Sequence, residues 1–175
     1  MSLNSVLQAV QDSPVGQLLR GSDPLVVIAF QLLHIIGLLV LLTAVLLLTL
    51  RLFNLGLRQQ SPQEVAQLAR PLQRHGLLTV VISGAAMFVS NAVVYAANPA
   101  LQLKLLLLLL AVGLQASLTH LLLKGPVGAE KPATAESEQP AHDLQSLPAL
   151  ARVGALASLL LWTGTGLAGR AIGFI

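Results

Sequence analysis

The apolar positions of this chain gather into long runs separated by short polar stretches. The first run extends from Leu25 to Leu50 and contains one ionisable residue, His34. At a helical rise of about 1.5 Å per residue, this run makes a helix roughly 39 Å long, which exceeds the ~30 Å hydrocarbon core of a bilayer. The pattern therefore predicts a membrane-spanning helix.

Three later apolar runs are also long enough to cross a membrane, at 76–97, 99–123 and 148–172. Proline stands at or near the start of three of the four spans, next to a residue that can cap a helix. These pairs are Asp23-Pro24, Asn98-Pro99, and Ser146 with Pro148. We expect an all-α fold, a four-helix bundle within the membrane, forming a single domain over residues 1–175.

The polar segments between these runs predict less regular structure. Residues 3–20 alternate apolar and polar positions at helical spacing, with a break at Ser13-Pro14, as in a short amphipathic helix on the membrane surface. Ser61 and Glu64 form a capping-box pattern for a second surface helix, and we expect Pro71 to bend the chain into the second span. Residues 125–147 are rich in Pro, Ala, Glu and Gln and predict a disordered linker that includes His142.

Basic residues favour one orientation of the four spans. Most Lys and Arg residues flank the two polar connections: Arg51, Arg58, Arg70, Arg74, Lys124, Lys131 and Arg152. By the positive-inside rule both connections are cytoplasmic, so both termini face outward, into the periplasm of a bacterial cell. The expected location is the bacterial inner membrane.

Composition limits the possible chemistry. The chain is 55% hydrophobic and only 10% charged, with a mean hydropathy of +0.79, so its main partner is the lipid bilayer. It has no cysteine, which excludes disulfides, thiolate metal sites, iron–sulfur clusters and covalently attached haem. The net charge is +3, but the basic residues flank the apolar runs, as they do in membrane proteins. Aromatic residues, which could stack on bases, make up only 3% of the chain. Both observations argue against a nucleic-acid partner.

Small and polar residues recur along each span at spacings of three and four, and we expect them to line helix contacts. In the first span the stripe is Gln31, His34, Gly37, Leu41 and Ala44. In the second it is Ser83, Met87, Ser90 and Val94, with Gly84 and Asn91 beside it. The third span has Lys104, Ala111 and Gln115 on one side and Gly113, Ser117 and His120 on another, and the fourth has Ala151, Ala155, Ser158, Trp162, Thr165 and Gly169.

Depth in the membrane sorts the ionisable residues into two groups. His34 lies about nine residues inside the outer face and Lys104 about five, which places them within two helical turns in depth. His75 and His120 both fall near the cytoplasmic edge. Haem b needs imidazole ligands, an apolar slot and basic groups near its propionates, so either group is a candidate site. Lys104, Arg20 or Arg170 could serve the propionates at His34, and Arg74 and Lys124 those at His75 and His120.

A non-catalytic role is the alternative for each histidine. His34 could be a buried residue that is hydrogen-bonded to Ser90, Asn91 or a backbone carbonyl. His75 and His120 lie near the wet interface, where ionisable residues are tolerated.

Three stretches carry a resemblance to known membrane proteins: SPVGQLLRGSDPLVVIAFQLLHIIGLLVLLTAVLLLTLRL, AANPALQLKLLLLLL, and the histidine that closes the third span. They resemble an uncharacterised family of bacterial four-helix membrane proteins, a domain of unknown function. More distantly, the layout is similar to HemJ-type protoporphyrinogen oxidases and copper-resistance D-type membrane domains. The HemJ-type resemblance implies His34 as a haem ligand, Lys104 as its partner and His120 as a weaker match.

The first functional hypothesis is a membrane protein that binds haem b and transfers electrons, with a quinone or another membrane redox protein as its partner. Whether it is also an enzyme stays open. The alternatives are a structural or accessory membrane subunit, and a small-solute or metal-ion permease. Copper transport is disfavoured because the chain has only two methionines. Outward-facing small residues leave a homo-oligomer open.

Overall fold

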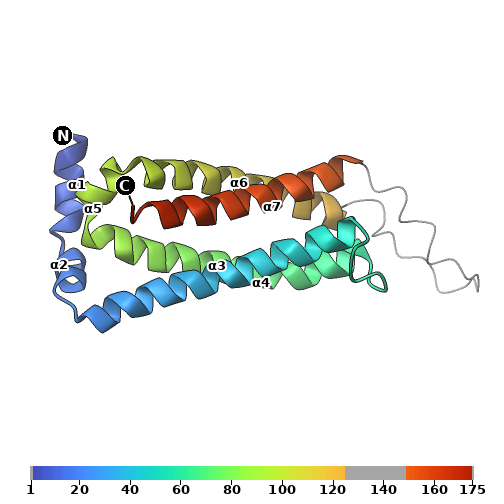
Figure 1. Cartoon of the computed structure of the whole chain (residues 1–175), viewed down its shortest axis with the longest axis horizontal. Coiled ribbons are helices and arrows are strands. Elements are labelled where there is room, and N and C mark those ends of the chain that lie inside the picture. The colour runs from blue at the N-terminus through green and yellow to red at the C-terminus, as the bar shows by residue number, and fades with distance from the viewer. Residues whose placement is uncertain (1, 125–148, 175) are drawn as a thin grey trace, which may run out of the picture.

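Seven helices make up the computed structural model, which describes residues 2–124 and 149–174 (Figure 1). They are α1 (Leu3–Gln11), α2 (Pro14–Arg20), α3 (Pro24–Leu52), α4 (Pro62–Ser90), α5 (Ala92–Ala97), α6 (Pro99–Lys124) and α7 (Ala149–Ala171). Four of them, α3, α4, α6 and α7, are long and apolar enough to cross a membrane. The chain is therefore all-helical where it is described and has the features of a multi-pass membrane protein.

Most of the predicted helix starts are confirmed by their caps. The Asp23 carboxylate accepts a hydrogen bond from Leu25 N at 2.8 Å, and the Asn98 side chain accepts one from Ala100 N at 2.9 Å. At Ser61 and Glu64 each side chain accepts from the backbone N–H of the other, which completes the predicted capping box. The predicted cap at Ser146, the linker 125–147 and His142 lie outside the described residues.

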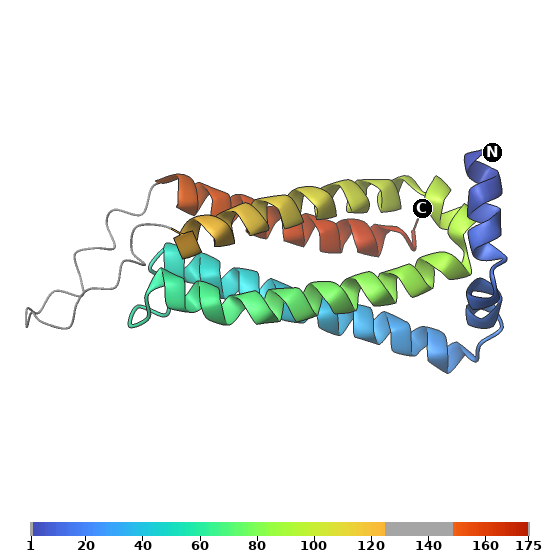
Figure 2. The same cartoon turned by 180° about the vertical axis from the view of Figure 1, so that it is seen from behind.

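The long helices form two antiparallel pairs, α3 with α4 and α6 with α7, and α3 also packs on α7 (Figures 1 and 2). Helices α1 and α2 lie across one end of the bundle, near α5 and the end of α7, and we call this the terminal end. The loop between α3 and α4 marks the opposite end, the loop end. The amphipathic segment predicted for residues 3–20 thus forms two helices, while its place on a membrane surface stays a prediction.

Glycines allow α3 and α4 to approach closely. A Cβ added at Gly76 would lie 2.8 Å from Gly37 O and 2.9 Å from Leu41 N, both of them backbone atoms of α3. A Cβ at Gly37 would lie 2.9 Å from the Thr79 Cβ. Only glycine fits at these two positions without a shift of one helix, which is how small residues bring membrane helices into contact.

Helix α3 is packed unevenly along its length. Its buried residues begin at Gly37 and continue to Leu52, whereas the side chains of Leu25, Leu32 and Ile36, nearer the terminal end, are 72%, 54% and 54% exposed. In both views the start of α3 stands away from α6 and α7 (Figures 1 and 2). The first half of α3 is therefore held mainly by α4.

Two predictions about the second span were wrong. No separate surface helix precedes it, because α4 runs without interruption from Pro62 through Pro71 to Ser90. The span also does not continue as one helix to Ala97, since Asn91 leaves helical geometry, with φ −146° and ψ 51°, and separates α4 from α5.

The predicted contact stripes are confirmed only in part. In α7 the stripe residues from Ala151 to Thr165 are buried. In α6 the stripe residues Ala111 and Gln115 are buried as well. Gly113, Ser117 and His120 instead lie on the exposed side of α6, and a Cβ on Gly113 would meet nothing within 4 Å. That face of α6 contributes nothing to the contacts within the bundle.

The loop end is organised by a buried cation. Arg51, the last charged residue of α3, is only 1% exposed. Its guanidinium donates to the carbonyl oxygen of Gln60 and, at 2.8 Å, to the Asn54 side-chain oxygen. Asn54 and Leu57 both adopt positive φ, near 57° and 54°. Arg51 thus holds the two sides of a tight loop together.

Candidate functional site

His34 is held by a serine on the neighbouring helix. Its Nδ1 lies 3.0 Å from Ser83 Oγ, and Ser83 is 2% exposed. The Ser83 hydroxyl donates its only proton to the carbonyl oxygen of Thr79, at 2.6 Å. Ser83 must therefore accept from His34, which places the imidazole proton on Nδ1 and leaves the lone pair on Nε2.

Lys104 of α6 contacts that second ring nitrogen. The Lys104 Nζ lies 3.1 Å from His34 Nε2, and the amino group is the donor because Nε2 carries the lone pair. Both side chains are partly buried. The sequence placed these two residues at a similar depth, and in the structure they are in direct contact.

Two glycines make room for this pair. A Cβ on Gly84 of α4 would lie 3.1 Å from the His34 ring at Cε1, and a Cβ on Gly169 of α7 would lie 3.1 Å from Lys104 Nζ. The site therefore draws on all four spans: His34 from α3, Ser83 and Gly84 from α4, Lys104 from α6, and Gly169 from α7. We refer to Ser83, His34 and Lys104 together as the polar triad.

Two of the alternative hydrogen-bond partners expected for His34, Ser90 and Asn91, were wrong. Ser90 donates to the backbone oxygen of Met87, and Asn91 is exposed at the break between α4 and α5. The partner is Ser83, which lies two turns earlier on α4 than Ser90. The recurrence of small and polar residues along the second span includes Ser83 but cannot tell which of them meets His34.

The other two candidate histidines lie elsewhere. His75 on α4 and His120 on α6 are both exposed on the surface of the bundle. His75 precedes Ser83 by eight residues, or about 12 Å along the helix, and His120 follows Lys104 by sixteen, or about 24 Å. They do not join the polar triad, and their role as haem ligands stays a prediction.

The arginines that were candidate propionate partners for His34 have partners of their own. Arg20 forms an ion pair with Asp12, at 2.9 Å, and also donates to the backbone oxygen of Gln11. The Arg170 guanidinium lies over the ring of Phe174, 5.5 Å from its centroid. Lys104 is therefore the cation that directly adjoins His34.

An apolar groove adjoins the polar triad on the side of the terminal end. Phe30 precedes His34 by one turn of α3 and Met87 follows Ser83 by one turn of α4. The remaining lining residues come from the same helices and α2: Leu19, Val26, Val27, Ala86 and Ser90. The site is thus bordered by an apolar surface.

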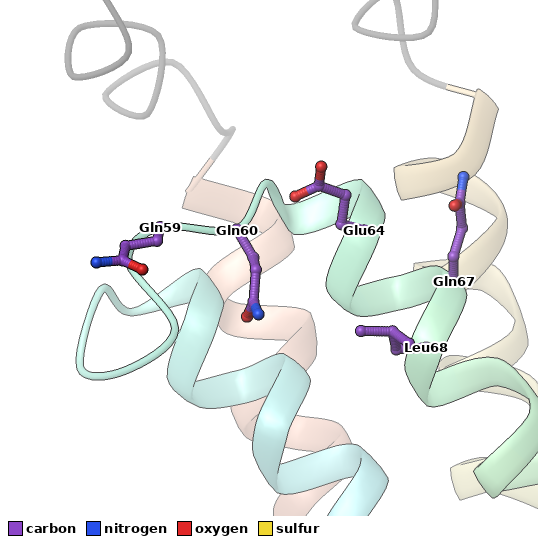
Figure 3. A pocket seen from close by; sticks show the side chains of 5 residues that line it. All are labelled: Gln59, Gln60, Glu64, Gln67 and Leu68. Carbon is purple, nitrogen blue, oxygen red and sulfur yellow. The ribbon is translucent and has the colours of Figure 1, made fainter.

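A second depression lies at the loop end of the bundle (Figure 3). It is shallow and lined by Gln59, Gln60, Glu64, Gln67 and Leu68. In the described part of the chain, no group of three or more His, Asp or Glu side chains is close enough together to hold a metal ion. A metal at the polar triad would therefore have a single histidine ligand, His34, which is enough to hold haem iron.

The tautomer of His34 can be measured directly. In nitrogen-15 spectra of histidine-labelled protein at neutral pH, we expect a protonated Nδ1 and an unprotonated Nε2 for His34. Lys104→Met should leave this tautomer unchanged, because Ser83 still accepts from Nδ1. His34→Gln assigns the signals by their disappearance. A proton on Nε2 in the wild-type protein would contradict the hydrogen-bond directions given above.

Comparisons with protein-family models, with curated proteins and with solved structures find no match to this chain.

Proposed function

We propose that this multi-pass membrane protein binds haem b through His34 and takes part in electron transfer. The observation that carries the proposal is the orientation of His34 by Ser83. Histidines that ligate metals commonly donate their other ring N–H to a fixed acceptor, which sets the tautomer and raises the basicity of the ligating nitrogen. In this chain the fixed acceptor is Ser83, and Nε2 is the nitrogen with the lone pair.

His34 and Lys104 supply the imidazole and the cation that such a group needs. His34 would hold the iron, and Lys104, which now donates to Nε2, would have to leave it and would supply a cation for a propionate. The apolar groove with Phe30 and Met87 begins one helical turn away, and its volume of about 20 Å³ means that the helices would have to part to admit a porphyrin. When bound, haem b supplies a one-electron couple within the membrane. A quinone or another membrane redox protein would be the electron partner, and the bacterial inner membrane the location.

The first test is the visible spectrum of the detergent-purified protein. We expect a b-type difference spectrum between reduced and oxidised protein, and about one haem per chain by the pyridine haemochrome assay. A colourless protein from cells with ample haem would end this proposal. Ser83→Ala should keep the colour but weaken haem binding about 10- to 100-fold, as for other lost partners of ligating histidines.

A second candidate function is a structural or accessory membrane subunit. It is favoured by the contact between His34 and Lys104, which joins the α3–α4 pair to the α6–α7 pair. In this role His34→Ala would leave the Lys104 amine without its acceptor in the membrane and lower the amount of folded protein. A small-solute or metal-ion permease, and a homo-oligomeric state, remain further hypotheses that no contact described above favours.

A double-mutant cycle tests the contact between His34 and Lys104, and the absorption spectra of the same proteins separate the two functions. For an accessory subunit, His34→Ala/Lys104→Met should recover the stability lost in His34→Ala, with a coupling of about 0.5–3 kcal/mol. For a haem protein, the double variant recovers stability but not the Soret band. The thermal midpoint and the absorption spectrum of the same four preparations provide both readouts.

A further inference from the structure

Two buried hydrogen-bond donors lie in the interior of the bundle without a partner. Gln115 on α6 is 6% exposed and Trp162 on α7 is 2% exposed. Neither Gln115 Nε2 nor Trp162 Nε1 makes a hydrogen bond with any residue that the structure describes. Burying a donor without an acceptor is costly, and hydrocarbon outside the bundle offers none.

Both donors belong to one layer of the bundle. The Ser158 hydroxyl donates to Gln115 Oε1 at 2.6 Å, which fixes the register of α6 against α7. One turn nearer the terminal end, Ala111 of α6 packs in the same buried cluster as Trp162. The attachment points of the two donors therefore lie about one helical turn apart, or ~5.4 Å along the bundle.

The buried hydroxyls near Trp162 on α7 already donate elsewhere, Ser158 to Gln115 Oε1 and Thr165 to the carbonyl oxygen of Leu161. The buried residues clustered with Trp162 are apolar: Leu41, Val45 and Ala111. All three are at most 1% exposed, so this layer is closed to the surroundings of the bundle. The Gln115 oxygen already accepts from Ser158. A small acceptor from outside the chain would satisfy both donors without moving the Ser158–Gln115 hydrogen bond.

We propose that a single water molecule is bound between α3, α6 and α7 and accepts hydrogen bonds from Gln115 Nε2 and Trp162 Nε1. Buried waters in proteins typically make two to four hydrogen bonds to polar groups that would otherwise be unsatisfied. The water oxygen satisfies both donors at once, and its two protons are free to reach helix carbonyls. This site does not depend on haem binding at His34.

Trp162 is the only tryptophan of the chain, so the test has one signal to follow. In protein labelled with nitrogen-15 tryptophan, we expect a dipolar cross-peak in the rotating frame between the indole Hε1 and water. Its sign distinguishes a bound water from proton exchange. The absence of a dipolar cross-peak would overturn the proposal, including the case in which Trp162 instead donates to a rotated Gln115 amide.

Substitution of the second donor completes the test. Gln115→Met keeps a similar volume but removes Nε2, and the dipolar cross-peak should weaken or vanish. Gln102→Met, on the exposed surface of the same helix, should leave it unchanged. A full cross-peak in Gln115→Met would show that Gln115 is not a partner of the water and would overturn the two-donor site. If Gln115→Met does not fold, the wild-type spectrum alone decides.

Discussion

His34→Ala is expected to lower the haem content of the purified protein at least about tenfold and to remove or shift its Soret band, while the protein still inserts. The reason is geometric. His34 presents its lone pair from a ring fixed by Ser83, and the neighbouring side chains at the site, Ser83 and Lys104, do not offer an imidazole in its place. Absorption of the purified variant, normalised to protein, gives the measurement.

The two exposed histidines provide matched controls for this experiment. His75→Ala and His120→Ala should each retain the wild-type haem content, because both side chains lie on the surface of the bundle. The reverse pattern, in which these two variants lose the band and His34→Ala retains it, would move the haem site to His75 and His120, nearer the loop end.

Gly76→Ala is expected to lower the free energy of unfolding by about 1–3 kcal/mol, the usual cost of an extra methyl group in a packed interior. The new Cβ would lie under 3.0 Å from backbone atoms of Gly37 and Leu41. Backbone cannot rotate away as a side chain can, so α3 and α4 must separate. The thermal midpoint of helical circular dichroism in detergent provides the measurement.

Gly113→Ala is the control for this substitution. Gly113 also lies within a long helix, but a Cβ there meets nothing within 4 Å, so alanine should be neutral or stabilising by up to about 1 kcal/mol through its helix propensity. The difference between the two variants isolates the contact at Gly76. Equal stability of Gly76→Ala and Gly113→Ala would contradict the close approach of α3 and α4.

The spans could be predicted from the sequence because their signals are local. Long apolar runs and Asx-Pro starts determine a membrane helix without reference to its neighbours, and the observed α3, α6 and α7 lie within two residues of the expected ends. The bend predicted at Pro71 was wrong, although a proline inside a helix usually kinks or breaks it. Pro71 stands ten residues into α4, where the chain continues as a helix to Ser90.

The sequence predicted the depth of the site residues in the membrane, but not how each helix is rotated about its own axis. Counting residues from the ends of the spans predicted that His34 and Lys104 lie within about two helical turns in depth, and in the structure they are in contact. The choice of Ser83 over Ser90 depends on how α4 is rotated and on the close approach that Gly37 and Gly76 permit. These are properties of the packed pair of helices, and a single span does not carry them.

The order of the four spans along the chain has a consequence for assembly. Synthesis proceeds from the N-terminus, and earlier segments fold before later ones. The hairpin of α3 and α4 contains both His34 and Ser83, so the imidazole acquires its first hydrogen bond as soon as that hairpin is inserted. Lys104 belongs to α6 and arrives afterwards. For an interval during biogenesis, Nε2 therefore has no lysine beside it.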